Sequence, residues 1–199
     1  SCGDSRRVEV SKGGASVPVG SEPTTAQLLG SVSGVRVGFD PKDRANILLA
    51  EAGSSWKPIP LPGGLKANWI YVGAGEASDQ ALIGVVECEG PAGECNQGAP
   101  HLFELTVPAA QLSDVPLPDL PINARLGGVE GDGGRQWLLF STFEKGVSTV
   151  FRFERRNGSW ARTSNPVFPD NAEVMGTSTC ATRDTLVVVA RYAPDESSP

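Results

Sequence analysis

A repeated unit of about 50 residues is the feature that most constrains the fold of this chain. The stretch LAEAGSSW at residues 49–56 returns in altered form as FERRNGSW at residues 153–160, each with a hydrophobic residue seven positions before its Trp. A middle copy has Leu105 seven positions before Leu112. Each copy is followed by a segment that contains alternating prolines: KPIPLPGG, SDVPLPDLP and ARTSNPVFPDN. A period of this length is typical of repeat architectures such as propellers.

Each copy contains short apolar segments of the length expected for β-strands. In the clearest copy these segments span residues 123–129, 136–143, 147–154 and 159–164. Apolar and polar residues alternate in TVFRFER, and Asn157-Gly158 is the preferred two-residue hairpin turn. The pattern therefore predicts a four-stranded antiparallel meander, which is the structure of one propeller blade.

Composition and length agree with an all-β chain. The sequence has 24 Gly and 16 Pro, and these residues cost about 1 and 3 kcal/mol in the interior of a helix. Its 199 residues, 39% of them hydrophobic, are enough for one domain with its own core. We therefore predict a small all-β propeller of about four blades. The predicted boundaries are an N-terminal segment at 1–25 and blades at 26–65, 66–121, 122–170 and 171–199.

The last predicted blade has only two strands, at residues 172–178 and 185–192. Such a blade leaves unpaired edges that another strand must cover. The N-terminal segments RVEV (7–10) and SVPV (16–19) alternate as short strands do. We expect these N-terminal strands to close the last blade, and the alternative is a larger ring completed by a second polypeptide.

One blade resembles a known family. GFDPKDRANILLAEAGSSWKPIPLPGG, residues 38–64, is similar to the blades of Asp-box (bacterial-neuraminidase-repeat) and sortilin-type propellers. In those blades a strand, an Asp-Pro hairpin turn, an aliphatic strand and a Trp-bearing outer strand follow in order. The Asp-box spacing of Ser, Asp, Gly and Trp is absent here, since GSSW and NGSW keep only its end. The resemblance therefore implies the fold and no activity.

Charge and hydropathy exclude two classes of partner. The net charge is −6 and the pI is near 4.9, whereas nucleic-acid binding depends on clustered Lys and Arg. No apolar run approaches the roughly 20 residues that span a bilayer. We therefore expect no nucleic-acid partner, and contact with a membrane only through a lipid anchor.

The cysteines point to the compartment. Cys88 and Cys95 lie in ECEGPAGEC, where Gly-Pro and Gly allow the chain to double back, and we predict a local disulfide between them. A disulfide indicates an oxidising, extracytoplasmic location, either secreted, periplasmic or on the outer membrane.

Two interpretations of Cys2 remain open. SCGDSRR resembles the junction between the lipobox and the mature chain of bacterial lipoproteins, although only Ser1 of a lipobox is present. In that case Cys2 carries a lipid. The alternative is a second disulfide between Cys2 and Cys180.

The sequence shows no complete catalytic constellation. Asp-box sialidases use an Arg cluster, an acid and a Tyr nucleophile, but Tyr71 and Tyr192 lie inside predicted strands without such neighbours. His101 is the only His, and no GxSxG motif is present. We predict that the chain is not an enzyme. The alternative is a sialidase-like or glycoside hydrolase-like enzyme, which needs only two suitably placed carboxylates.

Calcium is the one cofactor with any support from the sequence. Asp40, Asp43 and Asn46 recur every third residue in DPKDRAN. Calcium takes six to eight oxygen ligands, so these three side chains form a weak site, and Asp and Asn are also ordinary turn residues. No other cofactor is expected.

The expected function is an extracytoplasmic, non-catalytic binding or assembly module with a protein or glycan partner. Prolines after each outer strand remove hydrogen-bond donors from the blade edges, so we expect a partner to contact loops. The longest insertion runs from residue 89 to residue 100. Its predicted partner-binding residues are Glu89, Gly90, Glu94, Asn96 and Gln97. Trp56 and Trp160 are expected on outer strands, and Trp69 and Trp137 where the faces of blades pack.

Overall fold

The computed structural model describes residues 25–90, 96–132, 134–144, 147–163, 172–180 and 185–192. The expected N-terminal strands at 7–10 and 16–19, and also Cys2, Glu94 and Cys95, lie outside the described residues. For 172–180 and 185–192 we describe the backbone alone. No helix long and apolar enough to cross a membrane occurs in the part of the chain that is described.

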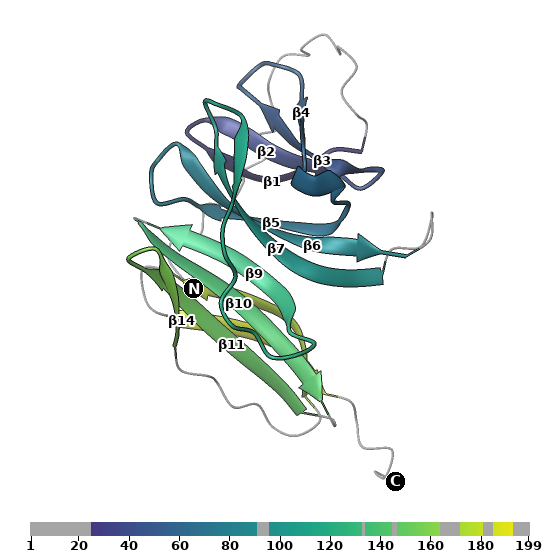
Figure 1. Ribbon diagram of the computed structural model, residues 1–199, viewed down its shortest axis with the longest axis vertical. Coiled ribbons are helices and arrows are strands. Elements are labelled where there is room, and N and C mark those ends of the chain that lie inside the picture. Colours follow the sequence, from purple (N-terminus) through teal and green to yellow (C-terminus); the bar gives the residue numbers. More distant parts are fainter. Residues whose placement is uncertain are drawn as a thin grey trace, which may run out of the picture.

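The described chain folds into antiparallel β-sheets whose strands follow one another in sequence order (Figure 1). The first sheet contains β1 (Gln27–Val32), β2 (Val35–Asp40), β3 (Asp43–Ala50) and β4 (Lys57–Pro60). The second contains β5 (Ala67–Ala74), β6 (Gln80–Glu89), β7 (Asn96–Thr106) and β8 (Gln111–Asp114). The third contains β9 (Arg125–Asp132), β10 (Arg135–Glu144), β11 (Val147–Arg156) and β12 (Ser159–Arg162). A short 3-10 helix, η1 (Pro62–Gly64), joins the first two sheets, and a further sheet contains β13 (Ala172–Cys180) and β14 (Thr185–Tyr192).

The prediction of an all-β chain built from four-stranded antiparallel meanders is confirmed for three sheets. The Asn-Gly turn between β11 and β12 forms as expected, with positive φ at Asn157 (51°) and Gly158 (76°). A closed ring of four blades is not observed, because the described strands of the last sheet are only β13 and β14.

The second sheet is buried on both faces, and this burial creates two cores. Alternate side chains of its central strand β6 point to opposite faces. Ile83 and Val85 pack with the first sheet, against residues such as Val37 and Ile47. Leu82 packs in the other core, with side chains of the third sheet such as Leu138. Full burial of each such side chain contributes roughly 1.5–3 kcal/mol.

The first strands of successive sheets contact one another in turn, β1 with β5, β5 with β9 and β9 with β13. Each of these inner strands also carries a one-residue β-bulge near its start. The register shifts skip Leu29, Asn68, Gly127 and Met175. A recurring bulge shows that the repeat extends to details of backbone geometry.

The second and third sheets meet closely at one end and spread apart at the other (Figure 1). At the close end, a Cβ built on Gly73 of β5 would lie 2.9 Å from the Cα of Glu130 in β9. Toward the starts of β5 and β9 the two sheets diverge, at the right of Figure 1. We call this arrangement of the two sheets a wedge.

Arg155 links the two sheets at the close end of the wedge. Its Nη1 donates a hydrogen bond to Oε1 of Gln136 at 3.0 Å and lies 3.7 Å from Oε2 of Glu104. Its Nε lies 3.4 Å from Oε1 of Glu76. Gln136 is fully buried and donates from Nε2 to the carbonyl oxygen of Ala74 at 3.4 Å. These contacts join β11 and β10 of the third sheet to the second sheet.

The far face of the third sheet, toward β13, buries charged side chains. The guanidinium groups of Arg135 and Arg152 lie 4.9 and 5.4 Å from the ring centre of Trp137. Glu154 accepts hydrogen bonds from Arg156 at 2.6 Å and from Arg135 at 3.1 Å. The bonds from Arg156 first, and then those from Arg135, hold the pKa of Glu154 below its usual value.

We expect Gly73→Ala to lower the free energy of unfolding by about 1–3 kcal/mol, because the new methyl group would meet the backbone of β9, which cannot move aside cheaply. Urea unfolding measures this change. The matched control is Gly30→Ala in β1, whose Cβ would lie an ordinary 3.6 Å from Cγ1 of Val72. An equal loss in both variants would show that the close approach does not matter.

Candidate functional site

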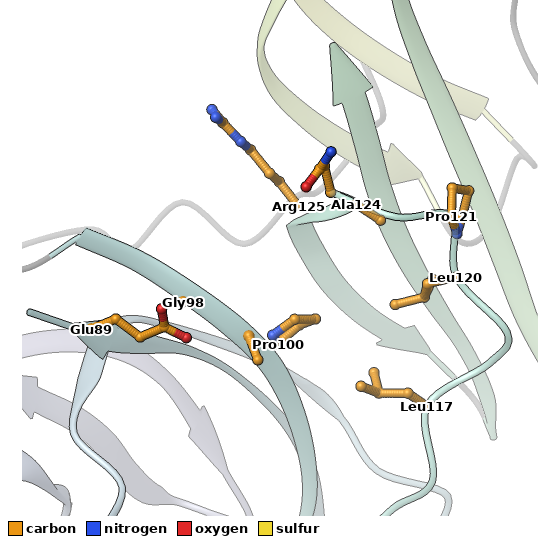
Figure 2. Close-up of a pocket in the computed structure, with 10 residues that line it drawn as sticks. Glu89, Gly98, Pro100, Leu117, Leu120, Pro121, Ala124 and Arg125 are labelled. Carbon is orange, nitrogen blue, oxygen red and sulfur yellow. The ribbon is translucent and has the colours of Figure 1, made fainter. Parts of the chain in front are cut away.

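The open end of the wedge forms a groove of about 660 Å³. One wall is the β6–β7 hairpin, with Glu89 and Pro100. The other is the linker between β8 and β9, with Leu117 and Leu120, together with Arg125 at the start of β9 (Figure 2). We call this space the wedge groove. Its volume lies within the range of about 300–1,000 Å³ that is usual for ligand pockets.

The hairpin wall depends on a glycine. β6 and β7 pair as far as Glu89 and Asn96, with one register shift between Val86 and Cys88, so the wall is a strand ladder rather than a loose loop. The side chain of Glu89 lies across the backbone of Gly98, where an added Cβ would come within 2.6 Å of Cγ of Glu89 (Figure 2). Glycine at this position thus leaves room for the carboxylate beside the groove.

The linker wall is held at both ends. At its start, the amide of Val115 donates to the carbonyl oxygen of Leu102 at 2.9 Å, and Nε1 of Trp160 donates to that of Pro116 at 3.0 Å. At its end, the amide of Ala124 donates to the carbonyl oxygen of Pro121 at 3.2 Å. Prolines fix φ and favour extended neighbours, so the linker between these points keeps a defined course.

The two walls carry opposite charges. Glu89 and Arg125 are exposed, and neither side chain makes a hydrogen bond or an ion pair with another described residue. An acid and a base without such partners are available to a ligand that carries both charges. Between them the groove surface is mixed, with proline, leucine and alanine side chains beside polar groups that include Asn123.

Two large apolar side chains are exposed near the groove. Trp69 of β5 is 50% exposed, and Ile122 of the linker is 84% exposed. Trp69 lies on an inner strand as expected, but half of its surface is exposed, so it is not fully packed between the sheets. Trp137, which was expected in the same setting, is buried at 1% exposure.

Trp69 lies on the face of the second sheet that borders the wedge groove. In the strand register Trp69 is opposite Val86, and Val86 is opposite Pro100. Residues directly opposite one another share a face of a sheet. Two strand spacings correspond to about 10 Å, so Trp69 lies about that far from Pro100 on the same face of the sheet.

The two remaining tryptophans cover apolar surface. The Trp56 ring lies over Gly38, where an added Cβ would be 2.8 Å from it, and the guanidinium of Arg36 is 4.9 Å from its ring centre. Trp160 packs against the core between the second and third sheets. Trp160 is on the outer strand β12, whereas Trp56 precedes β4 by one residue.

The predicted partner-binding insertion is shorter than expected. Residues 96–100 belong to β7, so only the segment after Glu89 and before Asn96 connects the two strands. Glu89 lines the wedge groove and Gly90 has a φ of 134°. The side chains of Asn96 and Gln97, and all of Glu94, lie outside the described residues. Sequence patterns identified Glu89 as a candidate partner-binding residue. They gave no signal for the linker wall, because the position of the linker beside β7 depends on tertiary packing.

Of the four cysteines, the structure describes the side chain of Cys88. Cys88 is disulfide-bonded, and Nη1 of Arg44 lies 4.0 Å from its sulfur. Cys95 lies outside the described residues, so its pairing with Cys88 stays a prediction. Cys180 ends β13 without a described side chain, and both interpretations of Cys2 stay open.

Tyr71 and His101 both have other contacts in the structure, and Tyr192 lies in β14, of which the backbone alone is described. Tyr71 packs against the core of the second and third sheets, and burial raises its pKa, which disfavours a nucleophilic phenolate. Nε2 of His101 lies 3.2 Å from Oε2 of Glu87, and its ring stacks on Phe103 at 6.4 Å. These contacts position His101 at the surface of the β6–β7 ladder.

The weak calcium site is occupied by turn hydrogen bonds. Oδ1 of Asp40 accepts from the hydroxyl of Thr25 at 2.6 Å and from the amide of Lys42 at 2.9 Å. Oδ2 of Asp43 accepts from Nδ2 of Asn46 at 2.8 Å. Across the described residues no group of three or more His, Cys, Asp or Glu side chains could hold a metal ion. The side chains thus act as turn residues here.

Comparison with family models, with curated proteins and with solved structures finds no match for this chain.

We predict that calcium at about 5 mM, enough to saturate a typical extracellular site, leaves the midpoint of thermal unfolding unchanged. A calcium-dependent rise in the midpoint would contradict this prediction.

The bond from Thr25 is the main reason that the pKa of Asp40 lies below its usual 3.8. A lowered pKa favours folding above pH 3.8, and this contribution is lost as the pH falls below that value. Thr25→Val should reduce the loss of stability between pH 5 and pH 2, measured by urea unfolding. An equal loss of stability in the unmodified protein and in Thr25→Val would contradict this role of the Thr25 hydrogen bond.

Proposed function

We propose that this chain is a non-catalytic binding or assembly module, and that its partner binds in the wedge groove. The observation that carries this proposal is the groove itself, with Glu89 and Arg125 on opposite walls and Trp69 exposed on the same face of the second sheet. A concave site that combines apolar side chains with polar groups is a common form of binding site.

We further propose that the sheets are consecutive blades of a β-propeller. Three meanders in chain order, with contacts between their first strands, support this fold. Among the described strands, β14 pairs only with β13, and such an edge favours strand addition. In this proposal residues 7–10 and 16–19 complete the last blade, and the alternative is completion of the ring by a second chain.

An extracytoplasmic location is part of the same proposal. The disulfide-bonded state of Cys88 supports it, because disulfides persist in oxidising compartments. Attachment to a membrane would occur through a lipid on Cys2, in the first of the two interpretations of that residue.

A photo-crosslinking amino acid in place of Ala99, which lines the wedge groove, tests the binding function. In cells that produce the protein, we expect a covalent adduct of defined mass. The matched control is the same substitution at Ser159, an exposed residue on β12, which should give no such adduct. Equal adducts from both positions, or none from Ala99, would contradict the assignment of the groove.

The glycan-processing alternative predicts a different result. Turnover of any member of an oligosaccharide panel, abolished by Glu89→Gln, would make the groove an active site and overturn the non-catalytic proposal. We expect no turnover by the unmodified protein or by the variant.

A further inference from the structure

Trp69 occupies a position where the other three inner strands have glycine. The residues directly after the bulge are Gly30 in β1, Trp69 in β5, Gly128 in β9 and Gly176 in β13. Each is opposite an aliphatic residue of the second strand, Val37, Val86, Leu139 or Val189. The four positions are therefore equivalent in backbone register. In the second sheet this position carries tryptophan, the largest side chain, in place of glycine.

The packing of the repeat does not explain this tryptophan. In the first sheet, a Cβ on Gly30 would already lie 3.6 Å from Cγ1 of Val72 on the next inner strand, so a small residue suits close packing there. Trp69 instead leaves half of its surface exposed. A bulge turns a side chain out of the regular pleat and often does so at functional sites. Exposed tryptophan next to a groove is typical of an interaction surface.

We propose that Trp69 is the anchor of the wedge groove, and that the groove binds an extended, proline-containing peptide segment of a protein partner. A basic residue of this segment pairs with Glu89, and an acidic residue pairs with Arg125. This inference rests on the proposed function and names the class of partner for the same site.

Charge complementarity and wall chemistry favour a peptide. Glu89 and Arg125 are on opposite walls without partners among the described residues, and a peptide carries both charges along one chain. The walls between these charges combine Pro100, Leu117 and Leu120 with polar groups that include Asn123, and a peptide offers both apolar side chains and backbone amides to such a mixed surface.

A polyproline II segment suits the distance between Trp69 and Pro100. It rises about 3.1 Å per residue and is extended before binding, so it loses little conformational entropy. Aromatic side chains provide the surface on which such prolines dock. The distance of about 10 Å from Trp69 to Pro100 corresponds to about three residues of this helix.

Two capped synthetic peptides test the proposal. Both contain two Pro-Pro-Leu units, one with an N-terminal Lys and a C-terminal Glu, the other with these two residues exchanged. We expect one peptide to bind with a dissociation constant below about 1 mM, measured by calorimetry. Trp69→Gly, which restores the residue of the other inner strands, should weaken binding about tenfold or more. Trp56→Phe in the first sheet is the matched control and should leave binding unchanged.

Charge reversal gives a second readout that does not depend on stability. The double variant Glu89→Lys with Arg125→Glu should prefer the peptide that the unmodified protein binds less well. If the double variant does not reverse the preference between the two peptides, or if Trp69→Gly binds as tightly as the unmodified protein, the inference is wrong. Trp69-dependent binding of a neutral oligosaccharide in place of both peptides would overturn it in favour of a glycan.

Failure of this inference is distinguishable from failure of the proposed function. If neither peptide binds at about 1 mM while Ala99 still gives a specific crosslinked protein adduct, the partner chemistry is wrong and the groove remains the binding site. If the adduct is also missing, both are wrong.

Discussion

Burial of the second sheet on both faces is the interaction on which the rest of the structure depends. Its central strand β6 supplies Ile83 to one core and Leu82 to the other, and both are fully buried. The first and third sheets are therefore joined through a shared layer rather than directly. Because apolar burial is the dominant favourable term in folding, loss of this layer would remove both cores together.

The wedge groove follows from how the third sheet docks on this layer. The contact of Gly73 with Glu130 and the clamp around Arg155 hold one end closed. Sheets twist, so two sheets fixed at one end diverge away from it. The divergence exposes Trp69 and leaves the proline-rich linker as the outer wall of the groove. Site and core are thus two results of the same packing.

Local patterns predicted the strands well, because alternation and turn chemistry are written in neighbouring residues. The segment 185–192 and the Asn157-Gly158 hairpin are examples. The exposure of Trp69 could not be predicted in this way, since it depends on contacts between β5 and β9 far from it in sequence. Residues 96–100 were expected in a loop because the segment after Glu89 is rich in glycine and proline. They belong instead to β7, which pairs with β6 as far as Asn96. The ring closure, the disulfide partner of Cys88 and the identity of a partner remain proposals.

Hydrogen exchange of backbone amides tests most directly whether the wedge is closed at one end and open at the other. Slow exchange requires burial and hydrogen bonding that only larger unfolding events remove. We expect the amides of Leu82 and Ile83 in β6 to exchange most slowly, and those of Leu117 and Leu120 in the linker to exchange fast. Protection of the linker amides equal to that of β6 would show that the groove is filled and would contradict this account.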